Sequence, residues 1–436
     1  MMKKWSRGLG LVCALALSAS VFAGCSSGKA AQQGAANESK SKENASQKLK
    51  PLSILYQYAN DDNKAGIETI ISKYKEQNPG LEVNAQGVPL SQFYQVLQTR
   101  VSAKNYPDVV FAPTAIVPSY AASGVLADLT PYLPKDFFKT FNETRTAVDR
   151  PNNTIVGAPI ADSIRAVIYN KTAFDKAGIK APGVNDAPWT WDQLVANAKL
   201  LQEKKAVRYG LMFEKPSFDG WMPFLFQSGG ALLDDKNQPA INNQASIDAI
   251  DWTVKLHKDG IAAPGIIEGT DDPLRLFVSG QIGMWLSSGT WNISALEQQV
   301  KGFEYSVTFM PQKVRNTTII GGNDVIAFKG NNVEGAAKFI DFSVSPAIIS
   351  IFTNSTASFP PRSDAKDVKF ARTDLVPIFT KQGQYLDATL TDQYLKDFYG
   401  KTKDQLLREL QSAVIGQQSP KQTADKMAEI IKKEVK

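Results

Sequence analysis

Few side chains in this sequence could carry out metal or nucleophilic chemistry. The 436 residues contain two cysteines, Cys13 and Cys25, and one histidine, His257. Zinc sites of the usual kind need several Cys or His ligands, and a histidine-based triad needs more than one lone imidazole. Because both cysteines lie near the N-terminus, a disulfide framework and a cysteine metal site are excluded from the rest of the chain. We therefore expect no metal and no cofactor.

Carboxylates are the remaining groups that could act on a substrate. Hydrolysis of a glycosidic bond needs two carboxyl groups roughly 5–9 Å apart across the scissile bond. The candidates are Asp162, Asp219, Asp271, Asp272 and Asp324. Spacing along the chain does not fix their separation in space, so a surface glycoside hydrolase stays open as an alternative, although only the presence of these residues favours it.

The composition is that of a soluble globular protein, with 43% apolar and 21% charged residues. The formal net charge is +6, and Lys3, Lys4 and Arg7 contribute three of the positive charges. The remainder of the chain is therefore close to neutral. Such a balance argues against a nucleic-acid partner held through phosphate contacts.

The N-terminus reads as a secretory signal. The three early positive charges precede an apolar run over residues 9–22, which is too short for a comfortable membrane span. The run ends in Val21-Phe22-Ala23-Gly24-Cys25, which resembles a bacterial lipobox with Phe22 in place of the usual leucine. We predict a signal peptide over residues 1–24 and lipidation of Cys25. Ordinary signal cleavage beside an incidental cysteine is the alternative.

Residues 26–50 contain almost nothing to bury and are rich in Ser, Ala, Gln, Asn, Lys and Gly. Such a composition is typical of a disordered tether. With acyl chains on Cys25, the folded part would be anchored to the extracytoplasmic face of a bacterial cell membrane. The segment 25–50 is therefore predicted to link a lipid anchor to a body that begins near Pro51.

Strand and helix patterns alternate along that body. Residues 52–56 read as a buried strand, and Ile67, Ile70, Ile71 and Tyr74 line one face of a helix over 62–78. Capping boxes at 190–193 and 419–422 open two further helices. The alternation predicts an α/β fold with largely parallel sheets. The ordered length exceeds what one core usually supports, so two lobes and a cleft between them are expected.

Six stretches of the body resemble a known family. They are 107–111 followed by 120–129, then 168–171 with Phe174 and 177–178, then 189–194, then 277–284 with 289–291, then 321–322 with 336–340, and the helix 419–435. No stretch is specific alone, but their order behind a lipobox is. The chain resembles the extracellular solute-binding proteins of ABC importers, in the group that includes sugar and maltodextrin binders.

The resemblance implies a two-lobed periplasmic-binding-protein fold, type II-like, with a ligand cleft between the lobes. It implies a hinge of three crossing segments, which we place at Ala161–Arg165, Met310–Ile319 and Pro360–Ala365. Lobe one would comprise residues 51–161 and 319–362. Lobe two would comprise residues 165–315 and 365–436.

The implied function is binding without catalysis. The protein would capture a carbohydrate by hinge closure and deliver it to the membrane subunits of an ABC permease, as a monomer and without a cofactor. A binding protein for another solute, such as a sugar phosphate or a polyol, is an alternative, and so is a structural or adhesive surface lipoprotein.

Aromatic faces suit pyranose rings, and polar groups suit their hydroxyls. The candidate ligand-binding residues are Trp291, Trp221, Phe218, Asp219, Tyr58, Asn60, Asp61, Asp162, Ser163, Gly322 and Asn323. Core packing is the alternative for the aromatic residues, helix capping for Asn60 and Asp61, and a simple turn for the glycine.

Three further sites are not assigned to ligand binding. Trp285 lies in an apolar run and is assigned to the core, and Arg362 is expected in solvent. Residues 112–117, where the family often carries a ligand contact, are apolar here. The ligand would then be held mainly by lobe two, or would not be a long oligosaccharide.

Overall fold

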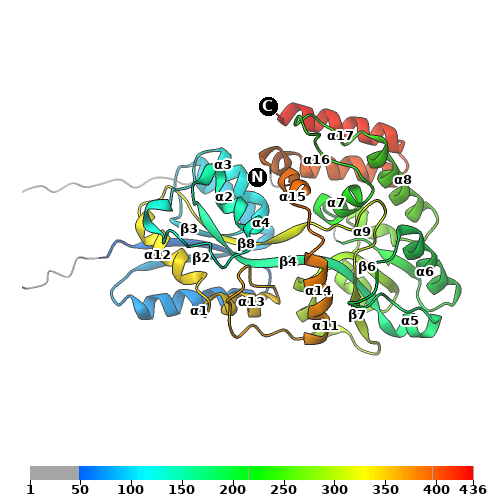
Figure 1. The fold of residues 1–436 in the computed structure, drawn as a ribbon, viewed down its shortest axis with the longest axis horizontal. Helices are drawn as coiled ribbons and strands as arrows, with labels where there is room; N and C mark the ends of the chain where they lie inside the picture. Colours follow the sequence, from blue (N-terminus) through cyan, green and yellow to red (C-terminus); the bar gives the residue numbers. More distant parts are fainter. Residues whose placement is uncertain (1–48, 215, 395, 436) are drawn as a thin grey trace, which may run out of the picture. The chain divides into compact units, whose positions relative to one another are not determined.

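The computed structural model describes residues 49–214, 216–394 and 396–435. The predicted signal peptide, Cys25 and nearly all of the predicted tether lie outside these residues. The strands follow the order β2-β1-β3-β8-β4-β6-β5, and β7 pairs with β4 (Figure 1). Their bounds are β1 Leu52–Tyr58, β2 Val83–Pro89, β3 Val109–Pro113, β4 Gly157–Asn170, β5 Tyr209–Met212, β6 Ile282–Gly289, β7 Tyr305–Thr308 and β8 Ile320–Ala327.

The long strand β4 belongs to two sheets. Its first part, from Gly157 to Ile164, pairs antiparallel with β8, and its second part, from Arg165 to Asn170, pairs antiparallel with β6 and β7. We call the sheet of β1, β2, β3, β8 and the first part of β4 lobe one. The sheet of β5, β6, β7 and the second part of β4 is lobe two. The fold is thus two-lobed and α/β.

The prediction of largely parallel sheets is only partly right. β1 pairs parallel with β2 and β3, and β5 pairs parallel with β6. β4, which runs between the lobes, is antiparallel to β6, β7 and β8, and β8, which follows the returning segment 309–319, is also antiparallel to β3. A strand that crosses from one lobe and another that returns must run in opposite directions, so the connections themselves impose this mixture.

Helices cover both faces of each sheet. In lobe one, Ile54 and Tyr56 pack with Ile67 of helix α1, whereas Leu55 faces Phe93 of helix α2 on the other side. The helices are α1 Asp61–Gln77, α2 Leu90–Ser102, α3 Val117–Ala122, α4 Glu143–Thr146, α5 Lys171–Ala177, α6 Trp191–Glu203, α7 Phe218–Gln227, α8 Gln244–Lys258, α9 Pro264–Glu268, α10 Pro273–Val278, α11 Ile293–Gln299, α12 Val333–Ser343, α13 Ile349–Thr356, α14 Val376–Gly383, α15 Ala388–Tyr394, α16 Asp397–Val414 and α17 Pro420–Glu434. Alternate residues of one strand therefore belong to two different core layers.

Local signals in the sequence place several helices correctly. The predicted helix 62–78 is α1, and its four predicted core residues are buried. Both predicted capping boxes are present, at the starts of α6 and α17. Among the described residues, no helix combines the length and the apolar character needed to cross a bilayer.

Two other segments pass between the lobes beside β4. Residues 309–319 connect β7 to β8, and residues 357–375 connect α13, which packs in lobe one, to α14, which packs in lobe two. Within the latter segment, Phe359 exchanges two backbone hydrogen bonds with Asp162, at 2.8 and 2.9 Å. β4 changes partners between Ile164 and Arg165, inside the predicted first crossing. The predicted lobe boundaries themselves stay predictions.

Candidate functional site

Trp291 lies in a short 3-10 turn that follows β6, and its indole is half-buried. The ring lies directly against Gly289, where a Cβ atom would come within 2.1 Å of the indole. Glycine is therefore required for this close approach. The Arg165 guanidinium carbon lies 5.1 Å from the ring centroid, so a cation covers part of the aromatic face.

Arg165 is held by an unusual backbone conformation in β6. Its Nη1 donates a hydrogen bond of 2.9 Å to the carbonyl oxygen of Ser287. Ser287 is fully buried and has a φ of +59°, in the left-handed region that a serine adopts only at some energetic cost. The pairing of β4 with β6 shifts register at this point, between Ala166 and Ile168. Strain is thus present where the Arg165–Trp291 pair forms.

Asp162 is part of a buried cluster around Arg145 rather than an open ligand group. The fully buried Arg145 side chain forms ion pairs with Asp162 at 2.8 Å, Asp324 at 2.7 Å and Asp149 at 3.7 Å. It also donates to the Thr114 hydroxyl at 2.8 Å. Because Asp162 is on β4 and Asp324 is on β8, Arg145 ties both crossing strands to lobe one.

Burial dominates the electrostatics of this cluster. It raises the pKa of Asp162 to about 6, although the Arg145 charge opposes the shift. Burial and the neighbouring Asp324 carboxylate raise the pKa of Asp149 well above its usual value. Three carboxylates around one guanidinium exceed its charge, so the geometry favours retention of a proton on Asp149.

The carboxylates considered for glycoside hydrolysis all have partners. Asp162 and Asp324 bind the same guanidinium. Asp271 forms an ion pair with Arg275, and Asp272 caps helix α10. Asp219 accepts a hydrogen bond from the Tyr399 hydroxyl. These contacts assign structural roles to the group and give no support to a hydrolase.

The predicted lobe-one residues lie at the end of β1, at the start of α1 and within β8. Asn60 accepts a hydrogen bond from the backbone N–H of Asn63 at 2.9 Å, which is the capping role left open by the sequence, and Asp61 is exposed in the first turn of α1. Tyr58 is half-buried, with the Lys64 ammonium 5.7 Å from its ring centroid. Asn323 accepts from the Gln57 amide at 2.8 Å.

Gly322 and Ser163 lie where the two crossing strands pair. Gly322 has a φ of +152°, and a Cβ atom there would lie 2.1 Å from the Ala161 carbonyl oxygen. Close approach of β8 to β4 therefore accounts for this glycine. Ser163 pairs with Gly321 and is half-buried.

Two of the predicted aromatic residues are in the core of lobe two. Phe218 and Trp221 are 2% and 1% exposed, and the Trp221 indole N–H donates to the Thr253 hydroxyl at 2.7 Å. The structure thus favours core packing, the alternative considered for both. Trp285 is buried as predicted. The expectation for Arg362 is wrong, because its side chain is only 12% exposed and is paired with Asp364.

Tyr94 is a candidate that the sequence analysis missed. It lies on α2 of lobe one, is 42% exposed, and has the Lys403 ammonium of α16 in lobe two 5.6 Å from its ring centroid. Partial burial and the carboxylates of Asp219 and Asp404 raise its pKa to about 12. Phe93 beside it is buried, and two successive helical residues do not face the same core. That pattern could have identified Tyr94 as an outward-facing aromatic.

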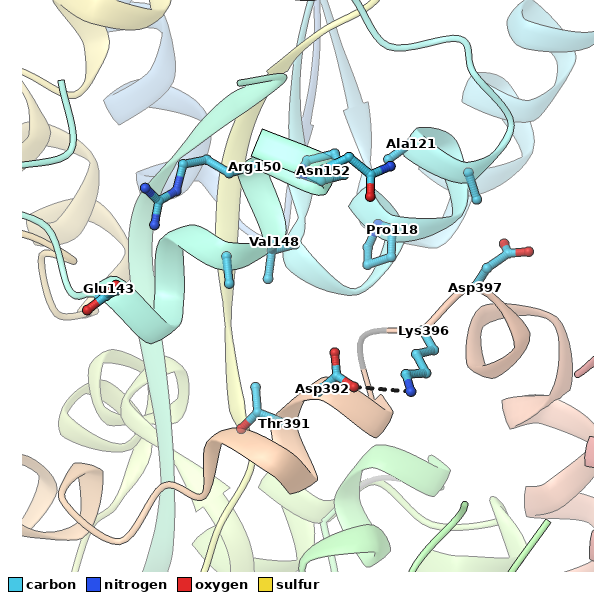
Figure 2. Close-up of a pocket in the computed structure, with 13 residues that line it drawn as sticks. Pro118, Ala121, Glu143, Val148, Arg150, Asn152, Thr391, Asp392, Lys396 and Asp397 are labelled. Atoms are coloured by element: carbon cyan, nitrogen blue, oxygen red, sulfur yellow. Dashed lines mark ion pairs between the residues drawn. The ribbon is translucent and has the colours of Figure 1, made fainter. Parts of the chain in front are cut away.

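A cavity of about 600 Å³ lies between α3 and residues 143–152 on one side and α15 with the start of α16 on the other (Figure 2). Pro118, Ala121 and Val148 line its apolar side. Lys396 and Asp392, which pair at 3.1 Å, lie on the opposite side. None of the predicted ligand-binding residues lines this cavity.

Across the described part of the chain, no cluster of His, Cys, Asp and Glu is arranged to hold a metal ion.

Comparison with known proteins identifies the family. Residues 69–377, more than half of the chain, match the bacterial extracellular solute-binding proteins. The chain belongs to this family. It is thus a solute-binding protein and not an enzyme, and the family places it outside the cytoplasm.

Relatives of this solute-binding protein carry related names. The multiple sugar-binding protein of Streptococcus mutans is 23% identical over 361 residues, which cover 78% of this chain and 79% of the relative. The maltooligosaccharide ABC transporter solute-binding lipoprotein of Streptococcus pneumoniae is 22% identical over 426 residues, or 92% and 93% of the two chains. The ABC substrate-binding protein of Listeria monocytogenes, solved with cycloalternan, superposes with a TM-score of 0.76 at 22% identity and covers 88% of this chain and 98% of its own. That superposition supports the two-lobed fold.

Proposed function

We propose that this protein is the solute-binding component of an ABC importer and that it captures a carbohydrate between its lobes for delivery to a membrane permease. The family and the ligands named for its relatives support the proposal. The observation that carries it is the half-buried Trp291 beside the crossing strand β4, because an aromatic ring at a hinge can bind a sugar while the lobes close.

Closure follows from contacts with both lobes. Tyr58 and Tyr94 are aromatic residues of lobe one that keep exposed surface, and Trp291 is their counterpart in lobe two. A ligand that binds both lobes favours the closed state by the difference in its affinity for the two states. Micromolar affinity corresponds to about 8 kcal/mol, which a few hydrogen bonds and one or two stacked rings can supply.

We further propose a monomer that is anchored through acyl chains on Cys25 to the extracytoplasmic face of the membrane. The lipobox-like sequence before Cys25 supports the anchor, and so does the lipoprotein named among the relatives. A polar segment over residues 26–50 would let the folded part reach the permease.

A ligand screen tests the central proposal. We expect a few members of a panel of mono-, di- and oligosaccharides, sugar phosphates and polyols to raise the melting temperature by several degrees, because a ligand that binds only the native state stabilises it. Trp291→Ala should reduce the shift and weaken binding about tenfold or more. Tyr132→Ala, which removes an exposed aromatic remote in sequence from the predicted site, is the matched control.

Two results would contradict the proposal. One is a melting temperature that no compound of the panel changes. The other is release of reducing ends from an oligosaccharide by the purified protein, which would show turnover. If a ligand raises the melting temperature of Trp291→Ala as much as that of the original protein, the proposed function is retained but Trp291 is not a ligand-binding residue.

A further inference from the structure

We propose that Arg165 makes this protein selective for carbohydrates that carry a negative charge, as a carboxylate or a phosphate. The inference rests on the proposed function and names the chemical class of the ligand. Arg165 lies at the point where β4 passes from lobe one to lobe two.

The alternation of β4 places Arg165 and Ser163 on one face of the strand. Val167, the next residue on that face, packs in the largest core cluster of lobe two. The intervening residues Ile164 and Ala166 belong to a different cluster on the opposite face. Asp162, the closest carboxylate along the strand, is held by Arg145 and is not available to Arg165.

Arg165 carries a half-buried charge with no carboxylate within 4.0 Å in the described part of the chain. Its Nε atom is buried without a hydrogen-bond partner there, and its one side-chain hydrogen bond among those residues goes to the Ser287 carbonyl. The partly buried Arg362 and Arg372 are each paired with a neighbouring aspartate. Because removal of an unpaired charge from water is unfavourable, a guanidinium in this position is suited to an external anion.

The backbone of β6 holds Arg165 in place. Gly289 pairs with Arg165 across the sheet. The strained backbone of Ser287 supplies the carbonyl that orients the guanidinium. A guanidinium has five N–H donors, so the donors that this carbonyl leaves free can bind the oxygen atoms of an anionic group.

The Trp291 indole indicates that the anionic ligand is a carbohydrate rather than a free inorganic ion. Because the Arg165 guanidinium lies over the indole, the two groups present a cation and an apolar ring at one place. A sugar acid or a sugar phosphate can contact the ring with its pyranose and pair its charge with Arg165. A neutral sugar that stacked on the covered face would have to displace the arginine and leave its charge unpaired.

Isothermal titration with matched pairs tests the inference. Each pair contains a neutral saccharide and its charged counterpart: a hexose with its uronic acid, a hexose with its 6-phosphate, and a disaccharide with the corresponding uronic acid disaccharide. We expect at least one charged member to bind at least tenfold more tightly than its neutral partner. The two arms, carboxylate and phosphate, distinguish which anion is preferred.

Variants connect the preference to Arg165. Arg165→Gln should remove the preference and weaken binding of the charged sugar at least tenfold, whereas Arg165→Lys should retain part of it. Arg275→Gln, which removes an exposed arginine on α10, is the matched control and should bind like the original protein. Melting curves without ligand confirm that each variant is folded.

Three outcomes would overturn the inference. They are binding of neutral sugars with equal or higher affinity, binding of no charged sugar at all, and charged-sugar binding that Arg165→Gln leaves unchanged. The first and third leave the carbohydrate-binding function intact. Absence of binding by every sugar, neutral or charged, would reject the proposed function as well.

Discussion

At the scale of single residues, Arg145 and Asp162 show how the crossing strands are fixed in lobe one. A buried ion pair gains stability only when its hydrogen bonds are satisfied, and Arg145 reaches two strands and the Thr114 hydroxyl at once. The proton balance of this cluster makes stability depend on pH.

The pH dependence of Asp162 has a definite sign. Its pKa is raised from 3.8 to about 6, so the folded protein binds more protons than the unfolded chain between these values. The contribution of Asp162 to stability is therefore present at low pH and is lost as the pH rises from about 4 to 6. The free energy of unfolding of Asp162→Asn, relative to the original protein, should rise over that range.

Urea denaturation at several pH values measures this difference. Asp425→Asn is a suitable control because Asp425 is a surface residue whose pKa is lowered by Lys421. A difference between Asp162→Asn and the original protein that stays constant with pH, or that falls, would contradict the assignment.

At the scale of elements, the approach of β8 to β4 depends on one glycine. Gly322→Ala should destabilise the protein by about 1–3 kcal/mol, because the added methyl group meets the Ala161 carbonyl and the positive φ disfavours alanine. Gly321→Ala is the matched control, since a Cβ atom at that position has its nearest neighbour at 3.7 Å. Equal urea midpoints for the two variants would show that the strands can separate without cost.

The elements also show what the sequence could and could not predict. Helix α1 and the two capping boxes depend on residues within a few positions of one another, so local patterns identify them. Arg145 binds Asp324, which is 179 positions away in the sequence, and no local pattern contains that information. Phe218 and Trp221 begin a helix near the lobe boundary, but tertiary packing buries both.

The same distinction applies within the candidate site. The Gly289-Thr290-Trp291 turn could be located from the family resemblance, and the structure places it beside β4. The sequence did not reveal that Arg165 covers the indole, because that contact depends on the register of β4 with β6 and on the positive φ of Ser287.

At the scale of the whole molecule, Tyr94 and Lys403 provide a contact between the lobes. Tyr94→Ala should weaken ligand binding about two- to fivefold, because a cation–π contact of an exposed pair contributes about 0.5–1 kcal/mol. It should also enlarge the radius of gyration of the ligand-free protein in X-ray scattering. Tyr132→Ala should change neither quantity, and an unchanged affinity in Tyr94→Ala would exclude this contact from closure.

The backbone pairing at Asp162 has a consequence for how the lobes can move. Asp162 pairs with Gly322 on one side and forms backbone hydrogen bonds with Phe359 on the other. Backbone pairing therefore joins three chain segments at one level of the molecule. Sliding one lobe past the other would break this row, whereas rotation about it would not. The opening motion is thereby confined to rotation about an axis formed by backbone. Evolution can therefore exchange the side chains around this axis to suit new ligands without changing the axis itself.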